Sequence, residues 1–126
     1  MNKKQYNYKI DKLNTWRFGI NNNELVNLVL SGKKTATTSL YDKNDIPAIG
    51  EESILTFLSG EAACITKTKE VIITEFKNIT WDLAKLEGEN NSLKEWQDEH
   101  RRFFKSINKN FCDETMVIFE IFEIKK

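Results

Sequence analysis

The residues best suited to chemistry lie in one short run, Gly32-Lys33-Lys34-Thr35, followed closely by Thr37. A threonine hydroxyl attacks a carbonyl carbon only when a base takes its proton, and a lysine serves as that base only when burial favours its neutral form. On an extended strand Thr35 and Thr37 point to the same face. The spacing therefore predicts that a lysine at the mouth of the strand and a threonine further along it converge on one ligand.

The same run superficially resembles the phosphate-binding loop of ATP- and GTP-binding proteins. That loop requires a glycine five residues earlier, where this chain has Asn27, and a helix after the loop. Here the apolar spacing predicts a helix before Gly32, capped by Asn22 or Asn23. Because no helix N-terminus would face a phosphate, we exclude ATP and GTP binding. Lysines after a helix also stabilise its dipole, but this alternative does not explain the threonines.

These residues must be positioned by strands and helices in a definite order. Hydrophobic periodicity and turn residues predict helices over 22–32, 80–86 and 92–107, and strands over 16–19, 35–40, 53–58, 62–76 and 116–124. The last strand is apolar on both faces and is expected inside the sheet. Helices do not alternate with strands, which favours an α+β fold with a curled, mostly antiparallel sheet or small barrel.

Length and charge limit the function classes. The chain has 126 residues, with 19 basic and 19 acidic side chains, so it is expected to form one domain over 15–126, preceded by an arm or helix over 1–14. A neutral chain excludes a bulk polyanion binder and leaves recognition by a local patch. No apolar run approaches the roughly 20 residues of a membrane helix, and no signal peptide is evident. We therefore expect a cytoplasmic protein without membrane contact.

A family resemblance appears once these segments are taken together. The run Leu30-Ser31-Gly32-Lys33-Lys34-Thr35-Ala36-Thr37 after a Leu/Val-rich helix resembles the signature of the ASCH family, which is related to PUA domains. Further similarity lies in Trp16–Gly19, Ile49–Glu51, Leu86–Glu89, Ser92–Trp96 and His100–Phe104. The resemblance covers about residues 16–124. It implies a small PUA-like β-barrel flanked by helices, with a cleft lined by Gly32–Thr37 that suits RNA or a nucleoside-like ligand.

The resemblance also implies a chemistry. One branch of the family hydrolyses acetylcytidine with a lysine, a threonine and a glutamate, which correspond by motif position to Lys34, Thr37 and Glu89. A shift of the alignment by two residues would put Glu87 in place of Glu89. The other chemistry linked to the family is ribonuclease activity. The chain departs from the amidohydrolase branch in its N-terminal length and longer 92–107 helix, and resembles a longer bacterial branch.

Several further residues could hold such a ligand. The chain has only three arginines, Arg17, Arg101 and Arg102, which could contact phosphate or a base edge at the rim of the cleft, although the last two could equally form a solvated face. Tyr41 could stack on a base, and Lys33 and Thr35 could contact the ligand.

The only histidine, His100, is expected to be packed and hydrogen-bonded, and we expect neither a metal nor a cofactor. The main hypothesis is a hydrolase of a modified nucleoside or of RNA, and the alternative is a non-catalytic RNA-binding module. The oligomeric state is left open.

Overall fold

The computed structural model describes residues 13–126, so the arm or helix predicted over 1–14 lies almost wholly outside the described residues. The elements are, in chain order, β1 (Asn14–Trp16), α2 (Asn22–Leu30), β2 (Ala36–Leu40), β3 (Glu52–Thr56), β4 (Ala62–Glu75), the 3-10 helix η1 (Phe76–Asn78), α3 (Trp81–Ala84), the 3-10 helix η2 (Lys85–Glu87), α4 (Leu93–Ile107) and β5 (Met116–Ile124). Within 13–126 no helix has the length and apolar character needed to cross a bilayer.

The strands form one curled sheet in the order β1-β3-β4-β5-β2. Only β1 and β3 are parallel; the other neighbours are antiparallel. The doubly apolar strand β5 lies between β4 and β2, which confirms its predicted interior position. The 14-residue strand β4 is the central strand of the sheet and pairs with both β3 and β5. Its pairing with β5 is irregular between Thr68 and Glu70.

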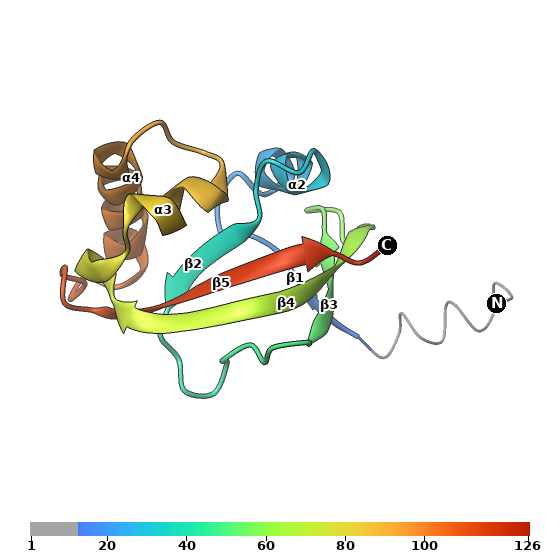
Figure 1. The fold of residues 1–126 in the computed structure, drawn as a ribbon, viewed down its shortest axis with the longest axis horizontal. Helices are drawn as coiled ribbons and strands as arrows, with labels where there is room; N and C mark the ends of the chain where they lie inside the picture. Colours follow the sequence, from blue (N-terminus) through green and yellow to red (C-terminus); the bar gives the residue numbers. More distant parts are fainter. Residues whose placement is uncertain (1–12) are drawn as a thin grey trace, which may run out of the picture.

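The predicted α+β class is confirmed, but the sheet is not closed into a barrel. In the described part of the chain β1 pairs only with β3, and β2 pairs only with β5. β1 has three residues and therefore offers too short an edge to complete the ring. The two edge strands remain unpaired with each other. The α-helices of residues 13–126 lie above the sheet in Figure 1, α2 over one end and α3 with α4 over the other.

Helix α2 ends as predicted at Gly32, whose φ of 84° is accessible to glycine at little cost. Its amide donates to the carbonyl of Val29, and the next two amides donate to the carbonyl of Leu28. The predicted capping by Asn22 or Asn23 is wrong, because the N-cap position is Asn21 and makes no side-chain cap bond. Asn22 is instead buried, where its side chain accepts from the Phe18 amide and donates to the Thr56 carbonyl.

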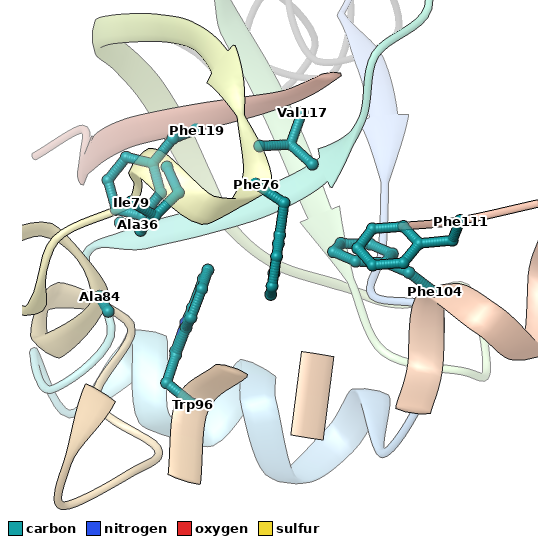
Figure 2. Packing of buried hydrophobic residues seen from close by; sticks show 9 residues of the cluster. All are labelled: Ala36, Phe76, Ile79, Ala84, Trp96, Phe104, Phe111, Val117 and Phe119. Carbon is teal, nitrogen blue, oxygen red and sulfur yellow. The ribbon is translucent and has the colours of Figure 1, made fainter. Parts of the chain in front are cut away.

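Two hydrophobic clusters flank the part of the fold that contains Lys34. In the larger cluster the Trp96 ring points from α4 toward Phe76 (Figure 2), and the two rings stack with centroids 5.3 Å apart. The smaller cluster includes Phe18 and the apolar face of α2. The ammonium of Lys34 lies 5.2 Å from the centre of the Phe18 ring, which belongs to the smaller cluster.

Candidate functional site

Lys34 is a buried charge held by two carboxylates. Its side chain turns inward directly after the end of α2, and only 2% of the residue is exposed. The ammonium nitrogen lies 3.0 Å from Glu87 Oε1 and 2.6 Å from Glu89 Oε2. An ammonium has three N–H donors, so these two partners leave one donor for the Phe18 face or for a ligand. Lys34 therefore supplies a fixed positive charge at a dry position.

Glu87 is surrounded by four donors. Its Oε1 accepts from Lys34 and faces His100 Nε2 at 3.4 Å. Its Oε2 accepts from the Thr38 hydroxyl at 2.7 Å and from the Trp96 indole at 3.0 Å. A carboxylate has about four lone-pair positions, so Glu87 has no free capacity for a ligand. Its role here is to organise the side chains around it.

Gly88 allows the two glutamates to flank Lys34. It has a φ of 74°, and a Cβ at this position would collide with the carbonyl oxygen of Lys33. Directly after that contact, the Thr35 amide donates to the Leu86 carbonyl at 2.8 Å. The segment just before β2 and the end of η2 are therefore in contact through backbone atoms. This close approach places the carboxylates on either side of Gly88 within reach of one ammonium.

The surroundings move the two carboxyl pKa values in opposite directions. Burial alone would raise the pKa of Glu87, but the charge of Lys34 and the hydrogen bonds of His100 and Thr38 outweigh it and lower the pKa to about 2. Burial raises the pKa of Glu89, and its contact with Lys34 offsets this only in part. Side chains whose pKa values are pushed apart in one cleft are typical of acid–base sites. Glu89 is thus the carboxyl better suited to exchange a proton.

His100 lies packed against Trp96, with ring centroids 4.2 Å apart. Its Nδ1 lies 2.8 Å from the Trp96 carbonyl and its Nε2 faces the Glu87 carboxylate, so both nitrogens face acceptors. Only the doubly protonated ring donates to both. Burial opposes that charge, but the hydrogen bond to Glu87 and its charge raise the pKa of His100 above its ordinary value. The predicted packed histidine also contacts the buried charge cluster.

A cleft of about 1010 Å³ opens above this cluster, where the sheet is not closed. The two edge strands, which do not pair with each other, both contribute to its walls. The residues come from β1 with the segment after it, and from β2 from Thr37 onward. Glu87, Glu89 and His100 line one part of it. Ligand pockets usually measure about 300–1,000 Å³, so the cleft has room for a nucleoside or nucleotide. The missing barrel closure therefore provides the opening of the candidate site.

The threonines of β2 divide between the two faces of the strand. Thr38 lies opposite Phe119 of β5 and bonds Glu87, on the side of the larger hydrophobic cluster. Thr37 lies opposite Glu120, and both threonines are among the residues that line the cleft. Among the hydrogen bonds of the described residues, none joins Thr37 to Lys34. The sequence thus pointed to Thr37 as the partner of the lysine cluster, whereas Thr38 makes that contact.

The other predicted contact residues are only partly brought together. Arg17 and Arg102 are exposed and line the cleft. Arg101 instead forms bonds of 2.9 and 3.1 Å to Asp113 and is not among the lining residues. The lining also does not include four further candidates, Lys33, Lys34, Thr35 and Tyr41. Thr35 bonds the backbone of Leu86, and Lys33 and Tyr41 are exposed.

Sequence reasoning missed four contributors to the site. Thr38 and Trp96 hold Glu87, Phe18 lies under the Lys34 ammonium, and Glu120 lines the cleft beside Thr37. Glu120 carried a signal, because it is one of two acidic residues in a mostly apolar strand, the other being Glu123. Among residues 13–126, no three His, Cys, Asp or Glu side chains lie together in a way that could hold a metal ion.

Comparison with known proteins agrees with this geometry. The sequence profile of the ASCH domain matches residues 14–126, nearly the whole described chain. The chain belongs to the ASCH family. None of the curated proteins matches it significantly.

Solved structures show that this ASCH chain shares its fold with proteins from several bacteria. It is 26% identical to an ASCH domain from Lactobacillus crispatus JV V101, with a TM-score of 0.81 over 98% of this chain and 86% of that one. It is 27% identical to a protein from Enterococcus faecalis V583, with a TM-score of 0.83 over 95% and 85% of the two chains. A mutant ASCH protein from Zymomonas mobilis, at 12% identity, 88% and 67% coverage and a TM-score of 0.54, shares the fold alone.

Proposed function

We propose that this ASCH domain binds a nucleoside-type ligand, free or within a short RNA, in the cleft and hydrolyses an amide on its base. The observation that carries the proposal is the buried ammonium of Lys34, which lies behind the wall of a nucleoside-sized cleft and holds two carboxylates, Glu87 and Glu89, that line it. A fixed charge in a dry site stabilises negative charge that develops on a carbonyl oxygen, since it needs no reorganisation during the reaction. The ASCH membership supports a ligand related to RNA.

In this scheme three side chains share the work. Lys34, directly behind the cleft-lining Glu87 and Glu89, stabilises the negative charge on the carbonyl oxygen by its own charge, and Thr37 is the nucleophile on the cleft wall. Glu89 is 14% exposed, lines the cleft and has a raised pKa, so it can protonate the leaving amine. Glu87 stays ionised and holds the lysine in place. The structure thereby favours Glu89 over Glu87 as the reacting carboxyl.

A specific observation also favours a second function, a non-catalytic RNA-binding module. Lys34 already donates to both carboxylates, and no hydrogen bond links it to Thr37 among the described residues. In that case the cluster only shapes the cleft floor, while Arg17 and Arg102 at the cleft contact phosphate. The neutral chain suits short or small ligands rather than long RNA.

One experiment separates the two functions. Wild type, Lys34→Ala and Glu89→Gln are incubated with acetylcytidine and with a short RNA, and the products are followed by chromatography. Lys33→Ala is the matched control, because Lys33 is the neighbouring lysine but is exposed, whereas Lys34 is buried and paired with Glu87 and Glu89. Hydrolysis by wild type and by Lys33→Ala, lost in the other two variants, supports the enzyme. Product from neither substrate with the wild type would retire the hydrolase hypothesis.

The binding function is measured with the same RNA at several salt concentrations. Arg102→Gln is expected to weaken binding and reduce the salt dependence by about one charge. Arg101→Gln is the control, since its guanidinium is occupied by Asp113 outside the cleft. Equal effects of the two substitutions would count against a role for the cleft rim.

A further inference from the structure

The cleft contains a second carboxyl centre that does not belong to the Lys34 cluster. Glu120 of β5 lines the cleft and lies directly opposite Thr37 in the antiparallel register of β5 and β2. Residues directly opposite each other point to the same face of the sheet, with Cβ atoms about 4.5–5.5 Å apart. The two side chains therefore project together into the cleft, from the strand face opposite to Thr38.

Glu120 is held in a fixed orientation. The Thr68 hydroxyl of β4 donates to Glu120 Oε2 at 2.7 Å. No other hydrogen bond or ion pair to Glu120 is found among the described residues, so Oε1 stays available on the cleft side. An anchored carboxyl with one free oxygen differs from Glu87, which is saturated by four donors. Glu120 can thus accept a hydrogen bond that Glu87 cannot.

The surroundings of Glu120 raise the pKa of its carboxyl group, which makes the carboxylate a stronger base. Burial raises its pKa, the Thr68 hydrogen bond lowers it, and the negative charges of Glu51 and Asp45 raise it again, with a net increase. Those two acidic residues also line the cleft. A base is most effective when its pKa approaches the working pH. Lys34, by contrast, is engaged with Glu87 and Glu89.

We propose that Glu120 is the general base for Thr37, so that these two residues of the neighbouring strands β5 and β2 form a hydroxyl–carboxylate pair in the cleft. This inference rests on the proposed hydrolysis. As Thr37 Oγ bonds to the amide carbon, its proton passes to Glu120. The C–N bond then breaks, and the leaving amine takes a proton from Glu89. Water next attacks the carbon of the resulting ester and gives its proton to Glu89. The bond between that carbon and Thr37 Oγ then breaks, and Glu120 returns its proton to Oγ. The net reaction is amide plus water to acid plus amine.

The first test needs no substrate. In Thr37→Cys the alkylation rate of the introduced thiol is followed against pH, with site-resolved mass spectrometry to separate it from Cys64 and Cys112. A neighbouring carboxylate disfavours the thiolate, so Glu120→Gln in the same background is expected to shift the midpoint down by about one pH unit. Glu123→Gln is the matched control, because it lies on the same strand, is exposed and is outside the cleft lining.

The second test is turnover of acetylcytidine. Glu120→Gln is expected to lower kcat at least about 100-fold with little change in KM, and Thr37→Val to lower it similarly. Glu123→Gln should leave turnover unchanged. Full activity of Glu120→Gln would overturn the base assignment while the hydrolase survives. If the wild type turns over no substrate, the proposed hydrolysis fails and the base assignment with it. An unshifted thiol midpoint would overturn the pair whatever the turnover shows.

Discussion

The ammonium of Lys34 and the carboxylate of Glu87 lie 3.0 Å apart, and each side chain is no more than 2% exposed. They come from the mouth of β2 and the end of η2, 53 positions apart in the chain. Removing one member of such a pair leaves an uncompensated buried charge, which costs far more than losing a surface pair. This ion pair therefore couples the stability of the fold to the geometry of the cleft.

Glu87→Gln should destabilise the protein strongly. The amide cannot neutralise Lys34 and cannot accept from all four donors, so we expect a loss of about 3–5 kcal/mol in urea unfolding. Asp82→Asn is the control, because its pair with Lys85 is exposed and should be worth at most about 1 kcal/mol. Similar losses in both variants would contradict the importance of the buried pair.

The contribution of Glu87 should also depend on pH. Its pKa falls from 4.5 in the unfolded chain to about 2 in the fold, so its stabilisation is complete above pH 4.5 and is lost as pH falls toward 2. The size is on the order of 3 kcal/mol. The difference in unfolding free energy between wild type and Glu87→Gln, measured from pH 7 to pH 2, should shrink in that window. A constant difference would argue against an ionised Glu87.

His100 should show the opposite pH dependence. Its pKa is raised above the model-compound value of 6.5, so its stabilisation is fully present below pH 6.5 and is lost as pH rises through the higher folded value. Two-dimensional NMR of the ring nitrogens should report double protonation at pH 6.5. In wild type, stability should fall as the ring titrates above that pH, and His100→Gln should lack this decline. A neutral ring at pH 6.5 would refute the prediction.

Gly88→Ala should be more damaging than a typical glycine substitution. Both Gly88 and Gly60 have positive φ, but only at Gly88 would the new methyl group collide with backbone, at the Lys33 carbonyl. Gly60→Ala, which meets nothing nearby, should cost about 1–2 kcal/mol from its backbone conformation alone. Thermal unfolding should show a larger loss for Gly88→Ala, together with reduced ligand binding as Glu87 and Glu89 move.

The local signals in the sequence predicted the elements well. The end of α2 at Gly32, the start of α4 after Ser92, whose hydroxyl accepts from the Glu95 amide, and the interior strand Met116–Ile124 follow from turn chemistry and hydrophobic pattern. The sequence left a curled sheet and a small barrel as alternatives, and the structure has the open form, with the three-residue strand β1 at one edge. No periodic signal specifies that length.

The candidate site was predicted less completely, for geometric reasons. Lys34 and Glu89 come together because Gly88 allows a backbone contact between distant segments, and only the motif resemblance hinted at it. Strand alternation places Thr38 but not Thr37 beside Glu87, and helix rotation places Arg102 but not Arg101 at the cleft, so neighbours in sequence have different partners. The catalytic roles of Lys34, Thr37 and Glu89 stay predictions.

The buried charge cluster implies a conflict between folding and activity. Well-packed apolar side chains of similar volume often replace a buried ion pair with no loss, or with a gain of about 1–4 kcal/mol. Lys34→Met combined with Glu87→Leu is therefore expected to yield an equally or more stable domain that lacks this ion pair beside the cleft. Selection for stability alone would favour that exchange. Under the proposed function, the buried pair of Lys34 and Glu87 lowers the stability of the domain and in return keeps a charge beside the cleft.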